Sequence, residues 1–105
     1  MTDNGAARFD WDEGNREKCR RHGISAAEIE AMLLRPFAVF PDPEHSRSEE
    51  RFKAIGTNDE GRHIFVVFTL RTRANTSLIR PISARYMRRK EVTYYEKEIA
   101  KTQKR

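Results

Sequence analysis

The chain has 105 residues, 37% of them hydrophobic and 35% charged, so it can form one hydrophobic core beneath a heavily charged surface. Cys19 is the only cysteine, which excludes an internal disulfide and a metal site built from cysteines. No apolar run approaches the ~20 residues of a membrane span, and the polar start MTDNGAARFD has no signal-peptide core. We expect a soluble, cytoplasmic single domain over residues 1–105, frayed over 1–7 and 102–105.

The net charge of +5 is unevenly distributed along the chain. Residues 71–105 hold 11 Lys and Arg against 3 Glu, whereas residues 1–70 hold 10 against 13 acidic residues. A basic half of this kind attracts phosphate backbones or acidic protein surfaces. The charge distribution therefore favours a polyanionic ligand and says nothing about the fold.

The N-terminal part predicts an extended segment and a short helix. Residues 8–11 alternate apolar and polar side chains, which is typical of a strand. Asp12 is a plausible N-cap for a helix that ends at His22, with Gly23 as its left-handed terminator. Because Asn15 and a neighbouring glycine weaken this helix, it must depend on tertiary contacts.

The next helix has stronger local signals. Ser25 and Glu28 have the spacing of a capping box, and Ile24 and Ile29 lie at the positions of a hydrophobic staple. The helix should end at Arg35–Pro36, since the residue before proline is disfavoured in a helical conformation.

Four strands are expected after these helices. A short edge strand over Ala38–Phe40 is followed by a strand from Glu49 to Thr57, then by His63–Leu70, which is apolar on both faces and should be central. The last strand, Leu78–Ser83, contains Pro81, which requires an edge position or a bulge.

A final helix is predicted from Arg85 to Lys101. Its apolar stripe of Val92, Tyr95 and Ile99 should dock on the sheet. The fold class is therefore α+β, a small antiparallel sheet of three to four strands with two N-terminal helices and a C-terminal helix.

A cationic segment joins the last strand to the last helix. Cations in the first turn of a helix oppose its dipole, at a cost of roughly 0.3–1 kcal/mol each. Such an arrangement calls for an acidic neighbour or a polyanionic ligand. The five cations of this segment are Arg80, Arg85, Arg88, Arg89 and Lys90.

Metal and thiol chemistry have little support in the sequence. The acidic residues near the first helix and the three scattered histidines form no ligand motif with metal-site spacing, so we expect no metal and no cofactor. The cations beside Cys19 would lower the pKa of its thiol, but a lone cysteine is more often a small buried apolar group.

Metal-free RNA cleavage fits the remaining residues. It needs a base for the 2′-hydroxyl proton, an acid for the leaving 5′ oxygen, and fixed cations for the charge of the transition state. Arginine suits the cationic role because its planar fork binds phosphate oxygens in pairs. The cationic candidates, expected around one hollow at the sheet rim, are Arg51, Arg71, Arg80 and Arg85. The possible proton carriers are His22, Glu50 and His45. Each of these residues could instead serve structure, through cross-strand ion pairs or a helix C-cap.

Three ordered blocks of sequence resemble the BrnT family of type II toxins. They are WDEGNREKCRRHGIS at Trp11–Ser25, EERFKAIG at Glu49–Gly56, and IRPISAR followed by RRKE and YYE. The resemblance covers most of the chain, from about Phe9 to Glu96. It implies a RelE-like ribonuclease fold and a toxin that degrades RNA and stops translation.

The resemblance also implies partners and site residues. The partner would be a small antitoxin with a ribbon-helix-helix portion, the pair forming a heterotetramer that contacts DNA only through the antitoxin. The family's K-H-G block falls on Arg21–Gly23 with arginine replacing lysine, its E-R pair on Glu50–Arg51, and its I-S-A-R block on Ile82–Arg85. Cys19 stands where many members have asparagine. The expected RNA-binding residues are Arg21, Arg88, Arg89 and Lys90.

Two functions of different classes remain after the sequence analysis. In the first, the chain is a metal-independent endoribonuclease in which three arginines, Arg71, Arg80 and Arg85, bind the scissile phosphate and His22 and Glu50 transfer protons. In the second, the chain is a binding module without catalysis, whose basic face holds an acidic antitoxin and contributes to autoregulation of its operon. A degenerate toxin that keeps the fold but not turnover belongs to this second class.

Overall fold

The computed structural model describes residues 8–103, apart from the side chains of residues 45, 102 and 103. The expected fraying of residues 1–7 lies outside this range, as do residues 104–105. The last helix is described as far as Gln103. The elements are α1 (Glu13–Arg20), α2 (Ala26–Leu33), β1 (Ala38–Pro41), the short 3-10 helix η1 (Pro43–His45), β2 (Arg51–Thr57), β3 (His63–Arg73), β4 (Thr76–Tyr86) and α3 (Arg89–Gln103).

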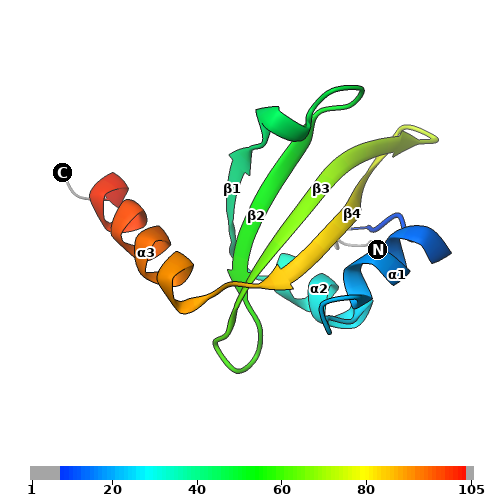
Figure 1. Cartoon of the computed structure of the whole chain (residues 1–105). Helices are drawn as coiled ribbons and strands as arrows, with labels where there is room; N and C mark the ends of the chain where they lie inside the picture. The colour runs from blue at the N-terminus through cyan, green and yellow to red at the C-terminus, as the bar shows by residue number, and fades with distance from the viewer. Residues whose placement is uncertain (1–7, 104–105) are drawn as a thin grey trace.

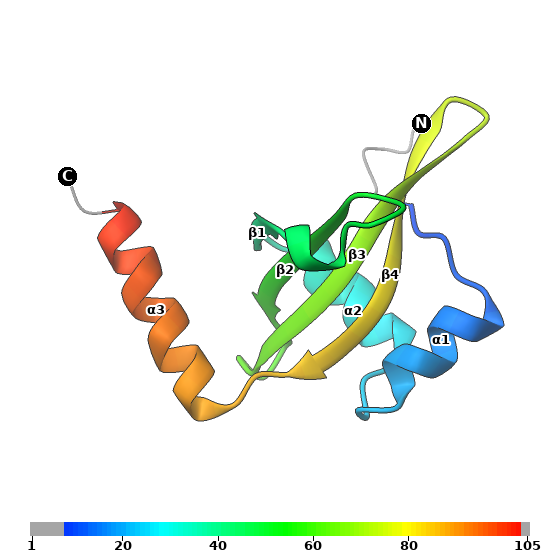
Figure 2. The ribbon, with the colours of Figure 1, turned by 45° about the horizontal axis from the view of Figure 1, so that its top comes forward.

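The four strands form one antiparallel meander in the order β1-β2-β3-β4. Helices α1 and α2 lie on one side of the sheet, whereas α3 leaves the end of β4 and extends on the other side (Figures 1 and 2). This arrangement confirms the predicted α+β class, with four strands, two N-terminal helices and a C-terminal helix. Within the described part of the chain, none of the helices has the length and apolar character needed to cross a membrane.

The hydrophobic core lies between α2, α1 and one face of the sheet. Ile24 and Ile29, the predicted staple pair, are fully buried with Met32. Met32 packs against β2 so closely that a Cβ added to Gly56 would lie 2.9 Å from its side chain. Glycine at position 56 therefore lets the helix approach the sheet.

Helix α1 is held by a network that the sequence analysis did not anticipate. Asp12 caps the helix as predicted, and Asn15 completes a capping box with it. The buried Asn15 amide also donates to the carbonyl oxygens of Asp10, at 3.0 Å, and Pro81, at 2.8 Å. The prediction that this helix depends on tertiary contacts is confirmed, because the bond to Pro81 joins α1 to β4, and Asn15 itself makes that bond. The helix ends at Arg20, two residues earlier than predicted, and Gly23 has the expected positive φ of 83°.

Helix α2 has one half of the predicted capping box. The Ser25 hydroxyl accepts from the Glu28 backbone N–H at 3.1 Å. The Glu28 carboxylate accepts instead from the Tyr86 hydroxyl at 2.8 Å and from the Asn58 amide at 3.0 Å. The bond to Glu28 raises the pKa of Tyr86. The second half of the box is thus replaced by tertiary contacts that tie α2 to the sheet.

Strand β4 lies at the edge of the sheet and carries a bulge. An edge position or a bulge was predicted from Pro81, and the structure has both. Val67 pairs with Ser83 and Phe68 with Pro81, so Ile82 is the extra residue. The strand continues to Tyr86, and Arg85 lies within it rather than in the final helix, where it had been predicted. The strand extends this far because Arg85 and Tyr86 still pair with Phe65 and Ile64 on β3.

Candidate active site

The face of the sheet away from α1 and α2, here called the open face, carries most of the candidate arginines. Phe52 and Phe68 are cross-strand neighbours, stacked at 5.4 Å, and pack against the helical core. Because side chains alternate along a strand, Arg51 and Lys53 point to the opposite face. The alternation of charged and apolar residues in the sequence of this strand predicts the same two faces.

One rung of the sheet brings two arginines from distant parts of the chain together. Arg51 on β2 is the register partner of Thr69 on β3, and Thr69 is the partner of Arg80 on β4. Directly paired residues share a face, and neighbouring strands are ~4.8 Å apart, so the two arginine Cα atoms are about 10 Å apart. Arg71 lies two residues along β3 from Thr69 and therefore on the same face. Thr69 is buried and donates to the Glu50 carbonyl at 2.6 Å.

Glu49 links two of these arginines. Its carboxylate lies 3.3 Å from the Arg71 guanidinium and 3.5 Å from that of Arg51. Within the described part of the chain, the buried Nε of Arg51 has no hydrogen-bond partner. Sequence analysis missed Glu49, although the two-residue period through Arg51 and Lys53 extends to it.

Arg80 is more enclosed than the other arginines. Its side chain is 16% exposed and lies 2.9 Å from Asp12 and 3.6 Å from Asp10. The pKa of Asp12 is lowered, mainly by the hydrogen bond from the backbone N–H of Asn15 and secondly by the hydrogen bond from Arg80. The carboxylates reach Arg80 because Phe9 forms a parallel bridge with Ile79, a long-range contact that spacing cannot predict.

Arg85 joins β4 to α3. It donates two hydrogen bonds of 2.8 Å to the two carboxylate oxygens of Glu91, and its guanidinium carbon lies 4.9 Å from the centre of the Phe65 ring. The hydrogen bonds from Arg85, and after them the bond from the backbone N–H of Arg88, lower the pKa of Glu91 to about 2. The hydrogen bonds to Glu91 in turn raise the pKa of Arg85. Glu91 is thus the acidic neighbour that the cationic segment required.

The arginines share a face but not a single hollow. Arg51 borders a hollow of about 540 Å³ with Glu44 and Arg47, whereas Arg80 borders another of about 490 Å³ beside α1. The expectation of one hollow around all four arginines was therefore wrong. The carboxylates hold the guanidinium groups apart, because Glu49 contacts Arg51 and Arg71 whereas Asp10 and Asp12 contact Arg80.

The predicted proton carriers do not gather at the open face. His22 and Arg21 are exposed in the turn after α1, on the side of the sheet that the helices cover. Glu50 is exposed just before β2, and the His45 side chain lies outside the described part of the structure. The predicted RNA-binding residues of the cationic segment, Arg88, Arg89 and Lys90, are exposed at the start of α3.

Other chemistry finds little support in the structure. Among the described residues, no group of three or more His, Cys, Asp or Glu side chains could hold a metal ion. Burial raises the pKa of Cys19 to about 11, so its thiol is protonated at neutral pH. Cys19 packs in the core as the small apolar group that the sequence analysis favoured.

Comparison with protein families gives one match, over residues 11–91, to the ribonuclease toxin BrnT of type II toxin-antitoxin systems. The chain belongs to the BrnT family. Comparison with curated proteins gave no match. The BrnT match covers Glu49 and all ten predicted site residues but ends at Glu91, so most of α3 lies beyond it. Membership makes RNA the substrate class and an antitoxin the partner, as the resemblance in the sequence had implied.

Proposed function

We propose that this BrnT chain cleaves RNA on the open face of its sheet, without a metal ion, by attack of a 2′-hydroxyl on the adjacent phosphate. The observation that carries the proposal is the rung on which Arg51 and Arg80 flank Thr69, with Arg71 beside it on the same face. Arg51 and Arg71, which share Glu49, can bind the oxygens of the scissile phosphate and stabilise the charge that develops in the transition state, and Arg80 can bind an adjacent phosphate of the same strand.

Proton transfer in this proposal uses residues of the same face. Glu49, which contacts Arg51 and Arg71, accepts the 2′-hydroxyl proton as the phosphate takes over the two guanidinium groups. Lys53, two residues along β2 from Arg51 and on the same face, donates a proton to the leaving 5′ oxygen. This assignment replaces His22 and Glu50, because His22 lies on the helical side and Glu50 makes only a backbone contact with the rung.

The test is cleavage of single-stranded RNA by the purified chain in excess EDTA. We expect cleavage to persist and to leave a 2′,3′-cyclic phosphate, because the 2′ oxygen is the nucleophile. Loss of cleavage on chelation, with recovery on adding a divalent cation, would show that a metal ion takes part. A product with a free 2′-hydroxyl and 3′-phosphate at the earliest times would contradict attack by the 2′ oxygen.

The antitoxin partner is proposed to carry a ribbon-helix-helix portion and to form a heterotetramer with this chain, which contacts DNA only through that partner. The support is the family resemblance and the basic C-terminal half, whose 11 Lys and Arg suit an acidic partner segment. Co-expression with the neighbouring reading frame, followed by mass measurement and operator-DNA binding, tests this assembly. DNA binding by the chain alone would contradict it.

A second candidate function is binding without catalysis. The observation that favours it is that every candidate arginine of the open face already has a carboxylate within 4.0 Å: Glu49 for two of them, the Asp10–Asp12 pair for Arg80, and Glu91 for Arg85. Such arginines could bind an acidic antitoxin segment by exchanging partners. In that case arginine substitutions would weaken the complex, and RNA would stay intact with the wild-type chain.

A further inference from the structure

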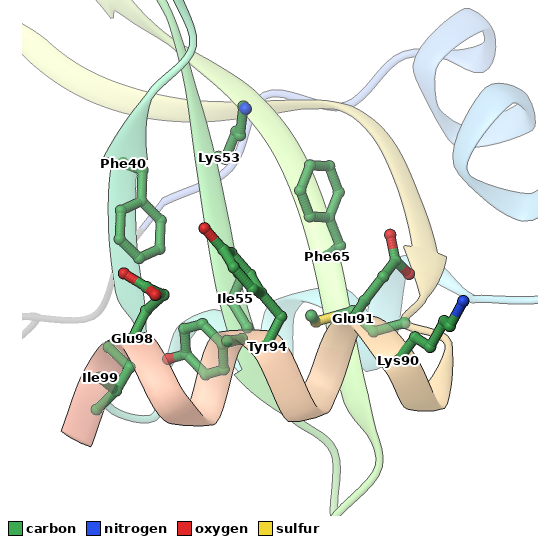
Figure 3. A pocket seen from close by; sticks show the side chains of 11 residues that line it. Phe40, Lys53, Ile55, Phe65, Lys90, Glu91, Tyr94, Glu98 and Ile99 are labelled. Carbon is green, nitrogen blue, oxygen red and sulfur yellow. The ribbon is translucent and has the colours of Figure 1, made fainter. Parts of the chain in front are cut away.

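A groove of about 660 Å³ lies between α3 and the open face of the sheet. Figure 3 shows Phe40, Lys53 and Phe65 on its sheet side and Tyr94 and Lys90 on its α3 side. The volume falls within the ~300–1,000 Å³ typical of small-ligand sites. The groove is therefore large enough to accept a planar ring system.

The groove stays open because α3 is attached at only a few points. Tyr95 packs edge-on against Phe40 at 6.4 Å and against His63 at 6.0 Å, and the Arg85–Glu91 pair holds the first turn. Tyr94, the residue before Tyr95, is 67% exposed and has no ring contact among the described residues. The helix is thus anchored through Tyr95, while Tyr94 is left available for a ligand.

We propose that this groove binds a nucleobase of the RNA substrate, next to the phosphate held by the arginines. The inference rests on the proposed function, since it places the base relative to that phosphate. Lys53 lines the groove and lies on β2 two residues from Arg51, so the groove begins two residues along the strand from the arginine rung. Unpaired bases in RNA are bound by stacking on aromatic side chains, with cations along the backbone path.

The lining of the groove combines aromatic rings, which suit a planar base, with four charged side chains, those of Lys53, Lys90, Glu91 and Glu98. Phe40 and Phe65 come from the sheet and Tyr94 from α3, so aromatic rings face the groove from both sides. Lys90 lines the same groove and can contact a flanking phosphate, whereas Lys53, which also lines it, is the proposed acid at the scissile phosphate. A hydrophobic segment of the antitoxin is the competing occupant, and the experiment below distinguishes the two.

The test uses single-stranded RNA with 2′-fluoro groups, which cannot be cleaved by 2′-oxygen attack, carrying one 2-aminopurine base whose fluorescence falls on stacking. With the wild-type chain we expect quenching on binding. Tyr94→Ala should weaken binding about fivefold or more and reduce the quenching, whereas Tyr94→Phe should keep both. Leu34→Ala, which removes an equally exposed apolar side chain from the other side of the sheet, is the matched control and should change neither.

A second probe, with an abasic site in place of 2-aminopurine, isolates the base. Wild type and Tyr94→Ala should bind it with equal affinity, because the contact that Tyr94 makes is already missing. Equal binding of the 2-aminopurine probe by both proteins would overturn the inference, and weakened antitoxin binding by Tyr94→Ala in the same series would then identify the groove as a protein site. The proposed function is tested separately, by measuring cleavage of ordinary RNA by the wild-type chain.

Discussion

Arg85 and Glu91 form a two-bond fork, with both nitrogen–oxygen distances at 2.8 Å, that connects the end of β4 to the first turn of α3. Glu91 also accepts from the backbone N–H of Arg88, so one carboxylate both caps the helix and orients it. Because α3 forms one wall of the groove, this pair links the local chemistry of the cationic segment to the shape of the candidate RNA site.

The first prediction concerns the pH dependence of this pair. The folded pKa of Glu91, about 2, lies below its ordinary value of 4.5. The pair therefore stabilises the fold fully above about pH 4.5, and this stabilisation is lost as pH falls toward 2. Glu91→Gln should lower the free energy of unfolding by about 0.5–1 kcal/mol at neutral pH, since the pair is partly exposed.

Urea unfolding of wild type and Glu91→Gln across this pH range measures the effect. Glu44→Gln, an exposed change in η1, is the control and should follow the wild-type profile. A constant difference between wild type and Glu91→Gln down to pH 2 would show that ionisation of Glu91 does not contribute to stability.

The second prediction concerns Arg51, whose buried Nε has no hydrogen-bond partner among the residues that the structure describes. Arg51→Ala should lower the rate of RNA cleavage by about 100-fold, as expected for loss of one transition-state donor. Arg51→Lys should recover little of this rate, because an ammonium group lacks the planar fork. Lys97→Ala, exposed on α3, is the control; an equal loss there would indicate that only nonspecific RNA binding had been removed.

The third prediction separates two adjacent carboxylates. Glu49→Gln should reduce kcat about 100-fold or more and abolish the acidic limb of the pH–rate profile, because the general base is lost. Glu50→Gln and His22→Ala should each change the rate less than about threefold, since neither side chain contacts the arginine rung, and a base role is worth far more than that. If Glu50→Gln or His22→Ala instead removes the acidic limb, the sequence-based assignment of the proton carriers is correct.

Local sequence signals were sufficient for much of the fold. The Ser25 cap and the buried Ile24–Ile29 staple follow from short-range patterns, and the period of two in β2 separates Arg51 from Phe52 correctly. Pro81 was placed at an edge with a bulge because its missing N–H allows few other positions.

Long-range partners could not be predicted in the same way. Glu28 bonds to Tyr86 rather than completing its capping box, and Arg80 is enclosed by Asp10 only because the segment before α1 runs beside β4. Likewise, the apolar stripe of α3 indicates that one side of the helix is covered, but not how closely the helix approaches the sheet. The groove beside Tyr94 was therefore not predictable from helical periodicity.

The fourth prediction addresses Asn15, which the sequence analysis had considered a weak point of α1. Its buried amide donates to the carbonyl oxygens of Asp10 and Pro81, so Asn15→Ala removes both hydrogen bonds. We expect a loss of about 1–3 kcal/mol in the free energy of unfolding, measured by urea denaturation. Lys18→Ala, exposed on the same helix, should cost less than about 0.5 kcal/mol. If the two variants lose equal stability, the link between α1 and β4 does not stabilise the fold, since alanine has the higher helix propensity and would not itself cause a loss.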